Sequence, residues 1–261
     1  VVARAGPGEE ALVDVMELPG RDTTEWTDKG GVKEGRKLGR LADGAAYRYQ
    51  VAAFNTARVR SPWSDTVEAQ TKQVPAVPWV SAVSTAEPRR VSLSWQANPE
   101  PDLATYRIEW SAEAGGRFRE AGIVAAPGTS FIHLGQPDGA VRCYRVKAVD
   151  QDTLESEWSV VACGSTKPLP PSPSGVKSSW EEGIPRLAWE APANADVRSF
   201  RVSRVGFMGL TATVLGNTED PFLVLSPGQV GKGLKLFVTA LDKDGLESER
   251  SETLELKPPA P

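Results

Sequence analysis

Apolar and polar residues alternate with a period of two along three stretches of this chain, and a turn of five residues follows each stretch. The stretches cover residues 47–55, 142–150 and 234–242. Val51 in the first corresponds to Val146 in the second and Val238 in the third, at offsets of 95 and 92 residues. Such alternation is typical of β-strands with one buried and one solvated face. The chain is therefore expected to contain three copies of one β-rich unit.

Other elements repeat in the same order. A short serine-bounded segment follows each turn: Ser61-Pro-Trp63-Ser64, Ser156-Glu-Trp158-Ser159 and Ser248-Glu-Arg250-Ser251. Two earlier strands, expected at residues 91–95 and 106–110, match residues 186–189 and 200–204. Short strands separated by turns rich in Gly, Pro and Asp predict an all-β chain of antiparallel sandwiches. No convincing amphipathic helix interrupts the pattern.

Proline-rich segments separate the copies, at residues 73–78 and 167–173. Proline cannot donate to a sheet ladder and favours an extended backbone, so these segments are expected to be semi-rigid spacers. The predicted domains are module 1 (residues 1–72), module 2 (residues 73–167) and module 3 (residues 168–261).

The aromatic positions resemble those of fibronectin type III domains, over essentially the whole chain. The likeness rests on a Trp in the second strand, an aromatic residue in the third, the Tyr-x-Tyr-x-Val run at residues 47–51 and the Ser-x-Trp-Ser that follows. It implies tandem immunoglobulin-like β-sandwiches joined by Pro-rich linkers. The structural core that it implies contains Trp95, Trp189, Tyr106, Phe200, Tyr49 and Tyr144. Many unrelated functions use this fold.

Modules 1 and 3 depart from the fibronectin pattern. Module 3 has Leu234 and Leu236 in place of the paired tyrosines of module 1. It has Arg250 in place of the tryptophan of the Ser-x-Trp-Ser segment. Module 1 opens with residues 1–4, which look like a third strand, so its first two strands are expected to come from about 30 upstream residues or from another chain. Residues 257–261 resemble the earlier spacers, which suggests a further module downstream.

The two cysteines, Cys143 and Cys163, both belong to module 2. Both are expected on the outer face of a hairpin whose two strands are joined by the turn at residues 151–155. This turn lies midway between the two cysteines in the sequence, so they should be neighbours across the strands. Cross-strand neighbours of this kind can form a disulfide, which implies an oxidising compartment. The alternative is two unrelated free thiols. Zinc normally needs four ligands, so two cysteines alone do not predict a metal site.

Composition changes this picture little. The chain is 40% hydrophobic and 25% charged, which is typical of a folded globular protein. Its net charge is −4, with both signs interspersed, which disfavours nucleic-acid binding. No apolar run approaches the roughly 20 residues of a membrane helix, and Val1 does not open a signal sequence. The chain is expected to be a mature protein or a fragment.

Catalytic residues are not apparent. The only histidine, His133, is expected on a solvated strand face. When module 2 is aligned with module 1, it takes the place of a polar residue near Asp28. Glu100 and Asp102 could form an acid pair, but their Pro-rich setting favours a loop. Calcium, nucleotide and nucleophile-elbow motifs are missing from the sequence. We therefore expect no catalytic residue, no metal and no cofactor.

Two surface features are candidates for binding. Trp158 is expected to stack against Arg145 and Lys147, as a local stiffener and not as a cytokine-receptor signature. The apolar residues 123–127 could be an exposed contact strand or a covered inner strand. The sequence has no Arg-Gly-Asp tripeptide.

The expected function is non-catalytic binding or scaffolding outside the cytoplasm, through adhesion or protein–protein contacts, in a bacterial envelope lipoprotein or a subunit of an envelope assembly. Its partners would be proteins at the envelope or cell surface, docking at sheet edges, inter-module clefts or the turns at residues 56–60 and 151–155. An alternative is a set of spacer modules in a secreted polysaccharide-degrading enzyme. A further alternative is an oligomer or larger assembly in which a neighbour completes module 1.

Overall fold

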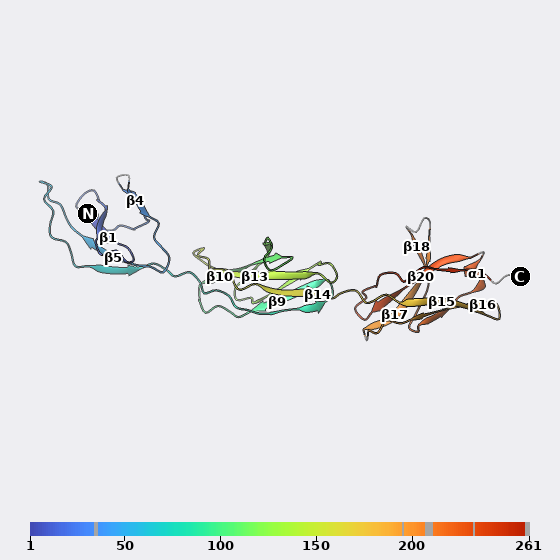
Figure 1. Ribbon diagram of the computed structural model, residues 1–261. Helices are drawn as coiled ribbons and strands as arrows, with labels where there is room; N and C mark the ends of the chain where they lie inside the picture. Colours follow the sequence, from blue (N-terminus) through green and yellow to red (C-terminus); the bar gives the residue numbers. More distant parts are fainter. Residues whose placement is uncertain (34–35, 195, 207–210, 232, 259–261) are drawn as a thin grey trace.

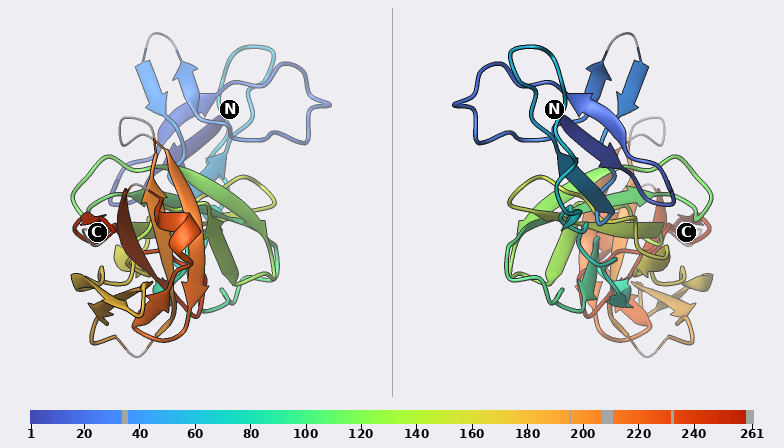
Figure 2. Two further views of the ribbon diagram at one scale, coloured as in Figure 1. Left: turned by 90° about the vertical axis from the view of Figure 1, so that its right-hand side faces the viewer. Right: turned by 90° about the vertical axis from the view of Figure 1, so that its left-hand side faces the viewer.

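The computed structural model describes residues 1–33, 36–194, 196–206, 211–231 and 233–258. Its regular structure is almost entirely β-strand, in three modules that follow one another along a line (Figure 1). In the end-on views the modules overlap in projection (Figure 2). Among the described residues, each strand pairs only with strands of its own module. The predicted fold class, all-β with tandem sandwiches, is confirmed.

Module 2 is a two-sheet sandwich. One sheet has the order β12-β9-β7 and the other the order β11-β10-β13-β14-β8. The strands are β7 (Val80–Val83), β8 (Thr85–Glu87), β9 (Arg90–Trp95), β10 (Leu103–Ser111), β11 (Arg119–Ala125), β12 (Ser130–Leu134), β13 (Val141–Asp150) and β14 (Ala162–Thr166). This is the strand order expected of a fibronectin type III-like domain.

Module 3 repeats this arrangement with sheets β15-β16-β19 and β18-β17-β20-β21. Its strands are β15 (Ser174–Glu181), β16 (Ile184–Glu190), β17 (Val197–Val205), β18 (Ala212–Thr218), β19 (Phe222–Val224), β20 (Leu234–Asp242) and β21 (Leu254–Leu256). A single turn of helix, α1 (Pro227–Val230), precedes β20 and buries Val230.

The tryptophans predicted for the core lie between the two sheets of modules 2 and 3. Trp95 meets Tyr106 edge to face with ring centroids 5.1 Å apart, and Trp189 meets Phe200 in the same way at 5.5 Å. Tyr144 is fully buried beside the first pair. Modules 2 and 3 therefore each have an apolar core of their own.

Module 1 has one four-stranded sheet, of order β2-β1-β5-β6, and a separate hairpin, β3-β4. The strands are β1 (Val2–Ala5), β2 (Val13–Met16), β3 (Gly31–Lys33), β4 (Arg36–Gly39), β5 (Ala46–Val51) and β6 (Val67–Gln70). β1 pairs with β5 as β10 pairs with β13, so the opening residues do take the place of a third strand.

The described part of module 1 has no counterpart of β7 and β9, and one face of its sheet is only partly covered. Val51 is 53% exposed, whereas Val146 at the equivalent position is fully buried. Tyr49, predicted for the structural core, is only half-buried because no second sheet of described residues packs over it.

In the serine-bounded segments, serine hydroxyl oxygens accept hydrogen bonds from backbone amides of the neighbouring strand. Oγ of Ser156 accepts from the Ala148 amide at 3.0 Å, and Oγ of Ser159 accepts from the Val146 amide at 2.9 Å. Serines in modules 1 and 3 make the equivalent bonds. This segment therefore satisfies the donors of the neighbouring strand without a regular ladder.

Candidate functional site

The hollow over the partly covered sheet of module 1 has a volume of about 1360 Å³. Tyr47, Tyr49, Val51 and Trp26 contribute to its lining. Tyr144 and Val146, the equivalents of Tyr49 and Val51, are buried in the core of module 2, so the hollow lies where the described part of module 1 lacks a counterpart of β9. Charged side chains meet at the junctions between modules.

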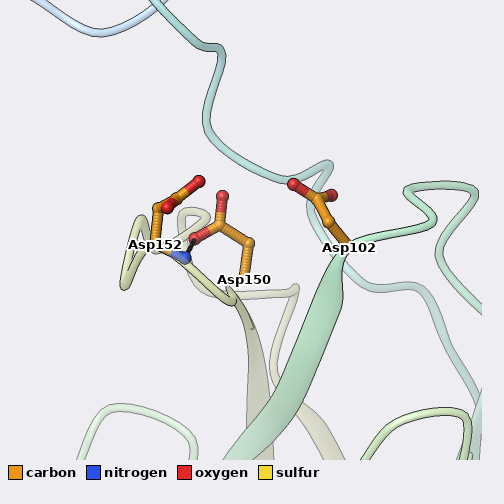
Figure 3. Close-up of side chains that lie close together, drawn as sticks. All are labelled: Asp102, Asp150 and Asp152. Carbon is orange, nitrogen blue, oxygen red and sulfur yellow. Dashed lines mark hydrogen bonds between the residues drawn. The ribbon is translucent and has the colours of Figure 1, made fainter.

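Lys72, just after β6, extends from module 1 into a cluster of three carboxylates on module 2. Its Nζ lies 2.5 Å from Asp102, 2.6 Å from Asp150 and 2.5 Å from Asp152. Figure 3 shows the three carboxylates turned toward one another, from the start of β10, the end of β13 and the turn after β13. The Lys72 backbone is held by its own module, because its carbonyl accepts from the Gly44 amide at 2.8 Å.

The same arrangement joins modules 2 and 3. Nζ of Lys167 lies 2.9 Å from Asp196 and 2.7 Å from Asp242, and it also pairs with Asp244. The Lys167 carbonyl accepts from the Gly139 amide of module 2 at 3.0 Å. Each lysine is therefore fixed to one module by its backbone and to the next by its ammonium. We call these two contacts the lysine clips.

The central aspartate of each cluster, Asp150 or Asp242, uses one carboxylate oxygen for a turn and the other for the lysine. Oδ1 of Asp150 accepts from the Leu154 amide at 2.8 Å and thereby shapes the turn after β13, while Oδ2 faces Lys72. In module 1, Asn55 shapes the equivalent turn by accepting from the Val59 amide at 2.9 Å. An asparagine can therefore replace the aspartate in the turn, but it supplies no second carboxylate oxygen for a lysine.

At the first clip, electrostatics favours the charged forms of Lys72 and Asp150. Hydrogen bonds to Asp102 and the other two carboxylates raise the pKa of Lys72. Burial of Asp150 opposes its ionisation, but the Lys72 ammonium and the amides of Leu154 and Asp152 outweigh burial and lower the pKa of Asp150. The cluster thus depends on the lysine to offset repulsion among three negative charges.

Carboxylate oxygens of Asp102, Asp150 and Asp152 all lie within 4.8 Å of one another, a spacing that could also hold a metal ion. Here the Lys72 ammonium is placed among them and contacts all three. Since this ammonium already bridges all three carboxylates, their close approach is explained without a metal.

Acid is expected to release the clip between modules 2 and 3. The Lys167 ammonium, and then that of Lys243, lowers the pKa of Asp196 to about 2. A carboxyl with a lowered pKa stabilises the folded contact above its ordinary pKa of 3.8 and loses that contribution as the pH falls toward 2. Small-angle X-ray scattering should therefore show an unchanged extended particle from pH 7 to about 5 and a more flexible one below about 3. Flexibility that is already present at pH 6 would contradict this assignment.

The predicted disulfide is present. Cys143 and Cys163 face each other across β13 and β14, with a Cα–Cα distance of 3.9 Å. The bond ties the last two strands of the larger sheet of module 2 together.

Replacing both cysteines with alanine is expected to destabilise module 2 alone. A disulfide that closes a loop of 20 residues contributes about 3 kcal/mol to the free energy of unfolding. For a domain of this size the unfolding temperature should fall by more than about 10 °C. Differential scanning calorimetry should show this shift in one transition while the module 3 transition stays in place. A shift below about 3 °C would contradict the expected contribution.

Trp158 lies where the sequence predicted, on the outer face of module 2. The Arg145 guanidinium carbon is 4.5 Å from the centre of its ring, and Nζ of Lys147 is 4.7 Å from it. Arg145 also lies 4.4 Å from the ring of Phe118 and pairs with Glu109. The indole is therefore one member of an alternating stack of rings and cations.

His133 was predicted on a solvated face, and this was wrong. The side chain points to the inner side of β12, where Nδ1 lies 3.0 Å from the Tyr144 hydroxyl. The comparison with Asp28 was sound, since Asp28 accepts from the equivalent hydroxyl of Tyr49 at 3.0 Å. The face was misassigned because a polar residue in an alternating strand suggests solvent, whereas a buried tyrosine hydroxyl also needs a partner.

Sequence reasoning missed both lysine clips. Glu100 and Asp102 were considered only as a possible acid pair, yet Glu100 accepts from the Ala76 amide of the spacer at 2.6 Å and Asp102 binds Lys72. The signal was present in the repeat: Lys72 and Lys167 are 95 residues apart, and an Asp-x-Asp pair follows the sixth strand in modules 2 and 3.

Comparisons with known proteins add little to this description. No protein family matches the sequence, and no curated protein matches it. The chain is similar to the crystal structure of the chicken CNTN1 FN1–FN3 domains at 13% identity and a TM-score of 0.34, with 99% of this chain and 88% of that chain covered. The fold assignment therefore rests on the strand order and pairing of the chain itself, which are those of a tandem fibronectin type III-like protein.

Proposed function

We propose that this chain is a non-catalytic scaffold that acts outside the cytoplasm and holds protein-binding surfaces at fixed separations. The observation that carries this proposal is the repeated lysine clip. A semi-rigid proline-rich spacer limits the angle between modules without fixing it, whereas each clip adds three charged contacts to the next module. Fixed spacing helps a protein engage two sites at once, since less conformational freedom is lost on binding.

The Cys143–Cys163 disulfide supports a location in an oxidising compartment. Among the described residues no helix is long and apolar enough to cross a membrane. These features suit a bacterial envelope lipoprotein, an adhesin or a subunit of an envelope assembly, with protein partners at the cell surface. Sheet edges and the turns between strands are the surfaces that such partners would contact.

Two measurements test this proposal. Small-angle X-ray scattering of the chain at neutral pH should give one extended particle of narrow length distribution, and a broad distribution of bent shapes would overturn the rigid-spacer role. Native protein should then be purified under mild conditions and its N-terminal mass determined. A lipid-modified N-terminus with envelope partners would support the scaffold.

The same stiff row of modules also suits spacer modules of a secreted polysaccharide-degrading enzyme. In that case the native protein would be one polypeptide that contains a hydrolase domain. Recovery of such a polypeptide would replace the scaffold with this second function, while the scattering result would stand in either case.

A further inference from the structure

The only histidine of the chain lies in an aromatic cluster at the inner side of module 2. The imidazole of His133 is 5.3 Å from the ring of Trp110, 6.0 Å from Phe131 and 5.9 Å from Tyr144, measured between centroids. While Nδ1 is unprotonated, the Tyr144 hydroxyl, 3.0 Å away, can donate a hydrogen bond to it. This cluster connects β12 of one sheet to β10 and β13 of the other.

The same position holds different chemistry in the other modules. In module 1, Asp28 accepts from the Tyr49 hydroxyl and from Arg4, which replaces the tryptophan. In module 3, Leu225 and Leu236 take the places of the histidine and the tyrosine, and both are buried. The three modules therefore carry an ion pair, a neutral imidazole and a purely apolar pair at one position.

We propose that His133 is an acid-sensitive latch, by which we mean a contact between the two sheets of module 2 that weakens when the imidazole gains a proton. Module 2 would then lose stability in mild acid while the other modules keep theirs. A protonated Nδ1 becomes a donor, so its hydrogen bond with the Tyr144 hydroxyl must reverse, with the hydroxyl oxygen now accepting. The charged groups that face the cluster are cations: Arg142 from β13, 4.7 Å from the Trp110 ring, and Arg119 from β11, 4.1 Å from it. An imidazolium would therefore be partly buried beside like charges.

The direction of the pH effect follows from the surroundings. Burial, and then the charge of Arg142, lowers the pKa of His133 below its ordinary value of 6.5. Folded module 2 thus binds fewer protons than its unfolded chain, and its stability falls as the pH drops through 6.5 toward the folded pKa. The residue equivalent to His133 is Leu225 in module 3, which does not titrate, and Asp28 in module 1, which is a carboxyl. Neither residue should therefore make the stability of its module change between pH 7.5 and pH 5.

Hydrogen exchange on the intact chain tests the latch. Val146 of module 2 and Val238 of module 3 are equivalent and fully buried, so each amide reports the opening of its own module. After correction for intrinsic exchange, the opening constant at Val146 should rise relative to that at Val238 between pH 7.5 and pH 5. The expected increase is about tenfold for each unit that separates the folded and unfolded pKa values. An unchanged ratio would overturn the proposal.

The single histidine makes a second measurement direct. The NMR titration of the imidazole C2 proton should give a pKa below 6.5, and a value at or above 6.5 would overturn the proposal. H133Q keeps a neutral hydrogen-bonding group and should abolish the pH-dependent ratio. H133L imitates module 3 and should do the same. A ratio that persists in the folded H133Q protein would assign the acid response to another group.

Discussion

Replacing Lys167 with methionine is expected to uncouple module 3 from module 2 while both sandwiches remain folded. The lysine side chain is only 12% exposed and contacts three aspartates, of which Asp242 is almost completely buried. Methionine preserves much of the aliphatic packing but leaves these carboxylates without that ammonium. Residual dipolar couplings of the two modules should fit one alignment tensor in the wild-type chain and two distinct tensors in K167M.

Matched variants separate the clip from general effects of charge. Lys243 contacts Asp196 but lies within module 3 and is half-exposed, so K243M should keep a single tensor. D242N should keep the turn, as Asn55 does in module 1, yet weaken the clip. A single unchanged tensor in K167M would show that the spacer, and not the clip, fixes the modules.

Replacing Trp95 with alanine is expected to bring module 2 close to unfolding. The indole is 3% exposed and packs edge to face on Tyr106. Loss of a buried tryptophan side chain costs about 3–5 kcal/mol, and a domain of this size has a free energy of unfolding of about 5–15 kcal/mol. Urea denaturation followed by far-UV circular dichroism should show one transition displaced to much lower urea, with the others unchanged.

Trp158 supplies the control for this experiment. It is only partly buried, and its partners Arg145 and Lys147 lie on the solvated side of β13. Cation–π contacts of this kind contribute about 0.5–1 kcal/mol at exposed sites, so W158A should shift the same transition slightly. Equal losses for W95A and W158A would contradict the assignment of Trp95 to the core.

Much of the fold could be predicted because short-range pattern and internal repetition agree. Alternation at residues 142–150 placed Val146 and Ala148 on one face, and both are buried. The same register placed Cys143 opposite Cys163, as the structure has it. His133 was misassigned because alternation identifies a face but does not reveal what a polar residue on that face contacts.

The sequence by itself determined the three-fold repeat, the strand order of each copy and the disulfide, since each depends on residues that are neighbours within one hairpin or one repeat. Only the tertiary structure decided that Lys72 and Lys167 form ion pairs with aspartates of the following module. A clip joins a residue at the end of one copy to two turns of the next, and those turns approach each other only once β10 has paired with β13, or β17 with β20. The repeat marks these lysines and Asp-x-Asp pairs, but charged residues on turns are ordinarily solvated, so the sequence does not show that they contact one another.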